Sequence, residues 1–103
     1  MSIQTVWHGH TFTIHPHSAA WNNIGGIYIF CGVSPQNHWI PLYIGKTNSL
    51  STRIPQHEMW SQAQRLGASH VHARVVPLAS VRAVLEETLI RIYQPRLNTQ
   101  HAR

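Results

Sequence analysis

Two tyrosines in similar apolar triplets are the first residues of this chain whose types and spacing suggest chemistry. Tyr28 closes the triplet GIY at 26–28, and Tyr43 opens the triplet YIG at 43–45. The segment SPQN at 34–37 is a turn signal between them. An antiparallel hairpin would bring the two phenols side by side, where they could orient a water or take its proton.

Polar residues after the second triplet could complete such a site. Lys46 follows YIG directly, and Arg53 and His57 lie one helical turn apart in a segment predicted to be helical. A guanidinium binds phosphate oxygens bidentately, and an imidazole with an ordinary pKa near 6.5 suits proton transfer at neutral pH. This set is compatible with phosphodiester hydrolysis, which needs an activated water and positive charge at the scissile phosphate.

Carboxylates are scarce in the chain, at three Asp+Glu against eight Lys+Arg. A metal site built from several carboxylates is therefore not expected. Glu86, in a predicted helix, could instead hold a single Mg²⁺ or Mn²⁺ completed by waters and phosphate oxygens. Glu87 is the alternative ligand, and a simple ion pair of Glu86 with Arg82 is the structural alternative.

The charge balance favours a polyanionic partner. The formal net charge is +5 at pH 7 and the sequence pI is about 10.4, which is typical of proteins that bind nucleic acid. The basic residues are spread along the chain, so a folded surface must gather them. No apolar run approaches the roughly 20 residues of a membrane span, and neither a secretory signal nor an internal disulfide of the lone Cys31 is expected.

The elements that must position these residues predict one α+β domain. Apolar, β-branched runs predict strands at 27–33, 39–45 and 70–76, with Pro41 marking an edge strand or a bulge. A helix capped at 48 or 49 should run to about 66, kinked or divided at Pro55. Ser80 should cap a second helix that ends before Pro95, with apolar residues on one stripe: Val81, Val84, Leu85, Leu89 and Ile92.

The order of these motifs resembles the GIY-YIG nuclease domain, over roughly residues 25–98. GIY and YIG are followed by Arg53 and His57, then by Glu86 three residues before Leu89, and by the segment QPRLN that ends at Asn98. This arrangement is similar to the domain of the bacterial excision-repair incision subunit and of GIY-YIG homing endonucleases. The resemblance implies a small three-stranded antiparallel sheet flanked by helices, to which residues 11–14 could add an N-terminal strand.

The resemblance also implies roles for the residues. Glu86 would bind the metal, and Lys46 and Arg53 would contact the phosphate. Tyr28, Tyr43 and His57 stay open as the general base. Asn98 would contact substrate or hold the end of the domain by side-chain hydrogen bonds.

We therefore expect a cytoplasmic, metal-dependent DNA endonuclease of a repair or mobile-element type. Residues 1–24 would be an extension and 99–103 a tail, and specificity would come from DNA shape, a homodimer or a partner subunit. A catalytically silent nucleic-acid-binding or interaction module with the same fold is the alternative. A zinc-stabilised structural protein using histidine pairs at 8/10, 15/17 and 70/72 is a third hypothesis.

Overall fold

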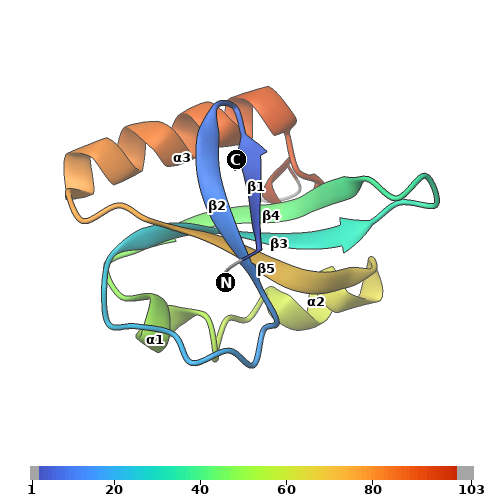
Figure 1. Ribbon diagram of the computed structural model, residues 1–103, viewed down its shortest axis with the longest axis horizontal. Helices are drawn as coiled ribbons and strands as arrows, with labels where there is room; N and C mark the ends of the chain where they lie inside the picture. The colour runs from blue at the N-terminus through green and yellow to red at the C-terminus, as the bar shows by residue number, and fades with distance from the viewer. Residues whose placement is uncertain (1–2, 100–103) are drawn as a thin grey trace.

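A five-stranded antiparallel sheet is the centre of the computed structural model, which describes residues 3–99 (Figure 1). The spatial order of the strands is β1-β2-β5-β3-β4. Their bounds are β1 (Gln4–Trp7), β2 (His10–His15), β3 (Gly26–Val33), β4 (Trp39–Thr47) and β5 (Ala68–Val75). The α+β class and the three predicted strands are confirmed.

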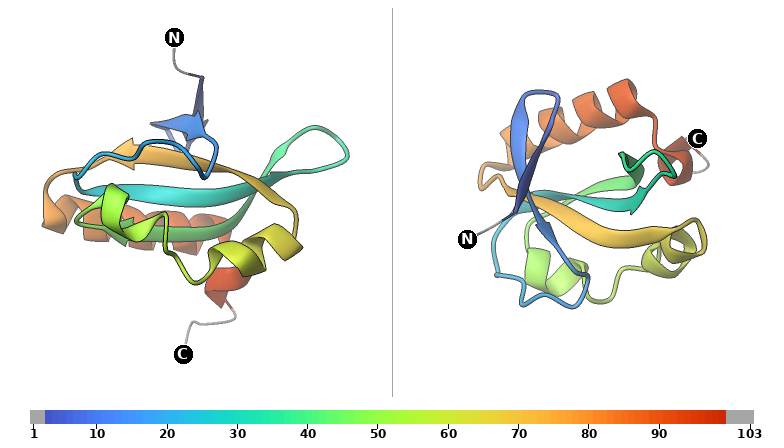
Figure 2. Two further views of the ribbon diagram at one scale, coloured as in Figure 1. Left: turned by 90° about the horizontal axis from the view of Figure 1, so that it is seen from below. Right: turned by 45° about the vertical axis from the view of Figure 1, so that its right-hand side comes forward.

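Four helices in the described part of the chain pack around this sheet: α1 (Leu50–Arg53), α2 (Trp60–Arg65), α3 (Ala79–Tyr93) and α4 (Arg96–Thr99). The long α3 runs along one side of the sheet, whereas α1 and α2 lie on the other (Figures 1 and 2). Two apolar clusters result, one beneath α3 and one beneath α1 and α2. None of the helices within residues 3–99 combines the length and apolarity that crossing a membrane requires.

The N-terminal hairpin extends the sheet beyond the three predicted strands. β2 pairs with β5 and confirms the added strand expected at 11–14, while β1 is a further strand that we did not expect. The turn between them places His8 and Gly9 at φ values of 48° and 78°. Two consecutive positive φ values are the geometry of a tight hairpin turn, which glycine adopts without strain.

The β3–β4 hairpin carries both tyrosine triplets. Tyr28 pairs with Gly45, and the register shifts between Phe30 and Cys31, where β4 contributes Pro41. Pro41 therefore lies both in an edge strand and at a bulge. Both positions suit proline, which cannot donate a ladder hydrogen bond.

The helix predicted after β4 is divided in two. The Ser49 hydroxyl accepts a hydrogen bond from the Thr52 amide and caps α1, which ends at Arg53, before Pro55. The segment 54–59 then links α1 to α2, and Gly67 ends α2 at a φ of 103°. His57 therefore lies in the linking segment, not one turn after Arg53 in the same helix.

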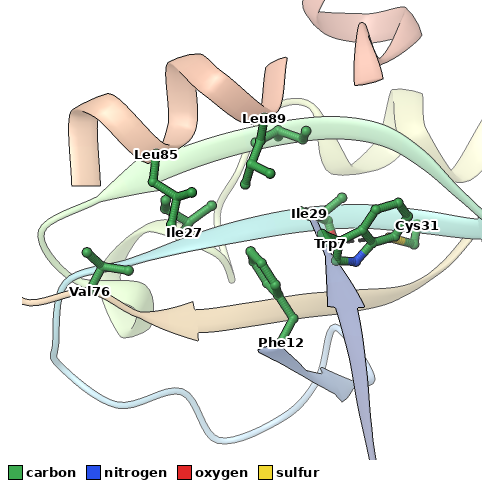
Figure 3. Close-up of a cluster of buried hydrophobic side chains, with 9 residues drawn as sticks. Trp7, Phe12, Ile27, Ile29, Cys31, Val76, Leu85 and Leu89 are labelled. Atoms are coloured by element: carbon green, nitrogen blue, oxygen red, sulfur yellow. Dashed lines mark hydrogen bonds between the residues drawn. The ribbon is translucent and has the colours of Figure 1, made fainter. Parts of the chain in front are cut away.

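Helix α3 differs in two ways from its prediction. Leu78, not Ser80, occupies the N-cap position, and the apolar stripe is only partly buried. Leu85 and Leu89 point into the core toward β3 (Figure 3), whereas three stripe positions are largely exposed: Val81, Val84 and Ile92.

Arg82 is buried instead of these three apolar residues. Its guanidinium donates hydrogen bonds to the carbonyls of Val76 and Pro77. Without these donors the carbonyls of Val76 and Pro77 would lack a partner, and unpaired buried carbonyls are costly. After α3, Gln94 turns the chain with a φ of 45°, and α4 begins after Pro95. Most of the expected tail at 99–103 lies outside the described residues.

Candidate active site

Tyr28 lies in the interior of the sheet, with only 1% of its surface exposed. It faces Gly45 across the β3–β4 ladder, and a Cβ at Gly45 would collide with the phenol oxygen and ring. Only glycine at this position lets the phenol lie against β4. Tyr43 lies nearby, with its ring centroid 6.4 Å from that of Tyr28. The hairpin thus brings both predicted tyrosines together.

This environment favours the neutral form of both phenols. Burial raises the pKa of Tyr28 well above its ordinary value, and the charges of Tyr43 and Glu86 act in the same direction. Arg53 opposes the rise in the pKa of Tyr28, through its charge and a hydrogen bond. Burial also raises the pKa of Tyr43, with Arg53 again opposing. Arg53 is therefore the group that favours a phenolate here.

His57 is enclosed by aromatic rings. Its ring centroid lies 5.4 Å from that of Tyr28, 5.0 Å from that of Tyr43 and 5.1 Å from that of Phe30, each at a steep angle. Nδ1 accepts a hydrogen bond of 3.0 Å from the Met59 amide, so the neutral ring carries its proton on Nε2. Burial lowers the pKa of His57 to about 4, and the Arg53 charge adds to this effect. The remaining donor of the ring, Nε2–H, is buried and has no hydrogen-bond partner among the described residues.

Arg53 forms a bidentate ion pair that sequence reasoning missed. Its two terminal nitrogens, Nη1 and Nη2, each lie 2.8 Å from one carboxylate oxygen of Glu58. A carboxylate five positions after the arginine and next to His57 was the available signal. Helical spacing gives no reason to pair them, because residues five positions apart do not face each other on a helix.

Lys46 and Glu86 meet on the other side of β4. The Lys46 ammonium lies 3.3 Å from Oε1 of Glu86, whose side chain is 18% exposed. Both residues line a hollow of about 420 Å³ beside α3. Glu87 is instead 79% exposed and lies 3.8 Å from Arg91. The structure thus places Glu86, not Glu87, against β4, and pairs it with Lys46 rather than with Arg82.

The site spans both faces of edge strand β4. Tyr43 packs with the cluster beneath α1 and α2, whereas Ile44 packs with the cluster beneath α3. Alternation along a strand places Gly45 on the Tyr43 side and Lys46 on the Glu86 side. The Glu86 and Arg53 charges nevertheless both influence the pKa of each phenol. The charged groups on the two faces of β4 therefore lie close enough to act on the same two phenols.

Asn98 holds the neighbouring part of β4 in place. Its side-chain oxygen accepts from the Ile44 amide at 2.8 Å, and its side-chain nitrogen donates to the Ile44 carbonyl at 2.9 Å. The amide thereby pairs with the edge of β4 as another strand would. A substrate contact of Asn98 stays a prediction.

The histidine pairs do not converge on a metal site. Within residues 3–99 no three His, Cys, Asp or Glu side chains gather as a metal-binding group. His72, for example, is fully buried and accepts a hydrogen bond of 2.9 Å from the Trp7 indole. The structural-zinc hypothesis therefore has no support in this part of the chain.

Solved structures with the same architecture connect this site to known proteins. The magnesium-bound GIY-YIG N-terminal endonuclease domain of UvrC from Thermotoga maritima is 30% identical, with a TM-score of 0.60 over 74% of this chain and 84% of that domain. A variant of that domain with a tyrosine replaced by phenylalanine, bound to its catalytic divalent cation, is 31% identical, with a TM-score of 0.59 over 74% and 83% of the two chains. No protein-family model matches the chain, and neither does any curated protein sequence.

The fold and the paired tyrosine triplets define a GIY-YIG nuclease domain fold. At this identity and coverage, the chain belongs to the GIY-YIG endonuclease domain family.

Proposed function

We propose that this protein is a divalent-metal-dependent endonuclease that hydrolyses DNA phosphodiester bonds at a single-metal site. The observation that carries this proposal is the position of Glu86. Its Oε1 lies 3.3 Å from the ammonium of Lys46, a residue of β4, the strand that also bears Tyr43. The relatives bound to a catalytic divalent cation support it, as does the net charge of +5. A basic surface favours a polyanionic substrate.

The donor set at Glu86 fits Mg²⁺ or Mn²⁺. Such ions are commonly held by one or two carboxylates, with waters and substrate phosphate oxygens completing the shell. Glu86 offers one partly exposed carboxylate. In the described residues it does not belong to a group of three or more His, Cys, Asp or Glu side chains that could hold a metal by themselves. When bound, the ion would polarise the phosphate and favour ionisation of a water.

Two cations of the chain would bind the substrate phosphate. Arg53 can donate two hydrogen bonds to non-bridging oxygens and stabilise negative charge that develops on them. Lys46 lies at the β4 edge with 46% of its side chain exposed, where it can reach a phosphate beside Glu86. The two cations approach the site from opposite faces of β4.

Tyr28 is the general base that we favour, with Tyr43 orienting the water. The Arg53 charge acts to lower the pKa of the Tyr28 phenol and so opposes the effect of burial. His57 is less suited to take the proton, because the ring lone pair on Nδ1 already accepts a hydrogen bond from the Met59 amide. The pKa of His57 is also lowered to about 4. We assign His57 to positioning the two phenols.

The decisive experiment compares the parent with Glu86→Ala and Glu87→Ala on plasmid, branched and single-stranded DNA, with Mg²⁺ and with Mn²⁺. We expect Glu86→Ala to cut at least about 10²-fold more slowly, and Glu87→Ala to cut like the parent. A folded Glu86→Ala protein with parental activity would refute the metal assignment. DNA binding without cleavage by the parent would instead support the catalytically silent module.

The substrate and setting are further parts of the proposal. DNA in the cytoplasm is the proposed target, and the free, buried Cys31 is compatible with a reducing compartment. Target choice by DNA shape, a homodimer or a partner subunit stays a prediction, as does a role in repair or in a mobile element.

A further inference from the structure

The bidentate pair of Arg53 with Glu58 has the geometry of a phosphate complex. Each terminal guanidinium nitrogen donates to a different carboxylate oxygen at 2.8 Å. The two non-bridging oxygens of a phosphodiester present a similar fork to a guanidinium. Glu58 and a DNA phosphate would therefore compete for the same two N–H groups of Arg53.

The pair is exposed enough to exchange partners without unfolding the domain. The side chains of Arg53 and Glu58 are 39% and 65% exposed, and ion pairs in such settings contribute little to stability. Glu58 belongs to the 54–59 segment between α1 and α2 rather than to either helix. A phosphate arriving from solvent could thus replace the carboxylate at modest cost.

Glu58 does not leave Arg53 by becoming protonated. The hydrogen bonds from Arg53 lower the pKa of the Glu58 carboxyl to about 2. The carboxylate is therefore charged at every pH at which the domain would work, and a competing anion is needed to remove it.

We infer that Glu58 occupies the phosphate-binding fork of Arg53 in the DNA-free protein, and that a DNA phosphate must displace it. This inference rests on the proposed role of Arg53 as a phosphate ligand. Glu58 is then an internal competitor that weakens binding of DNA at this position. A carboxylate that merely positions Arg53 would have the opposite effect, since its loss would weaken binding.

The test measures DNA binding without metal, so that cleavage plays no part. Fluorescence anisotropy of a labelled short duplex in EDTA would compare the parent with Glu58→Gln and Glu87→Gln. Both substitutions remove one negative charge from an exposed, ion-paired glutamate, so Glu87→Gln controls for the general change in charge. We expect Glu58→Gln to bind about two- to fivefold more tightly than Glu87→Gln, the range given by exposed ion pairs.

A double-mutant comparison ties the effect to Arg53. In an Arg53→Ala background, Glu58→Gln should gain no more affinity than Glu87→Gln does. The inference is overturned if Glu58→Gln binds no tighter than Glu87→Gln, if its gain persists without Arg53, or if no variant binds DNA. Failure of the parent to cleave with Mn²⁺ is a separate result, which would refute the proposed function while leaving an Arg53-dependent gain intact.

Discussion

Gly45 lies directly opposite Tyr28 in the β3–β4 ladder, and the missing side chain at Gly45 is what gives the Tyr28 phenol its place. Gly45→Ala should therefore displace the ring. We expect cleavage to fall at least about tenfold and the free energy of unfolding to fall by about 1–3 kcal/mol, as for other overpacked cores. Cleavage rates and urea unfolding would measure both effects. A stable Gly45→Ala protein that cuts at the parental rate would contradict this account.

Asn98→Ala should destabilise the domain, because both backbone groups of Ile44 would lose their partners. The expected loss is about 1–3 kcal/mol in the free energy of unfolding, measured by urea denaturation. If Asn98 only holds β4, cleavage well below the unfolding temperature should stay within a few-fold of the parent. A large loss of activity in fully folded protein would show a direct contact with substrate.

Acidification should destabilise the domain through His57. Its folded pKa of about 4 lies below the unfolded value of 6.5, so between these values the unfolded state binds more protons and stability falls as pH falls. From pH 7 to pH 5 the loss from this residue should be about 1–2 kcal/mol. His57→Gln should reduce the loss measured by urea unfolding. His38→Gln, at an exposed position in the β3–β4 turn, is the matched control and should leave it unchanged.

The pH dependence of cleavage should identify a phenol rather than an imidazole as the base. Burial raises the pKa of Tyr28 and of Tyr43, so the rate should continue to rise through about pH 8, by up to tenfold per unit. An imidazole base would produce a plateau above its own pKa. His57→Gln should lower the rate but keep the shape of the profile, and a plateau in the parent that this variant abolishes would reverse the assignment.

Metal removal should stop catalysis without unfolding the protein. The Glu86 side chain is outside both apolar clusters, so EDTA should leave the melting temperature unchanged within about 1 °C, whereas loss of a core contact would lower it by several degrees. Added Mg²⁺ or Mn²⁺ should restore cleavage. Full activity in EDTA would remove the basis for a metal role of Glu86.

Local sequence patterns predicted much of the fold. Alternating and β-branched runs located β3, β4 and β5 within a few residues, and Pro55 correctly indicated a divided helix. These signals are reliable because proline geometry and strand alternation act within a few residues of the chain. Helix α3 was located correctly too, but its buried face was not, because periodicity alone cannot tell that Arg82 supplies donors to the segment before the helix.

The sequence by itself determined which groups are available for chemistry: two tyrosines in paired triplets, few carboxylates and an excess of positive charge. Only the tertiary structure decided how these groups are partnered. Lys46 meets Glu86 across forty positions of the chain, Arg53 is held by Glu58, and the proton of His57 is directed by the Met59 amide. The reason is physical: residue types set what a side chain can donate or accept, but the packing of α3 against β4 and the path of the 54–59 segment set which donor and acceptor meet.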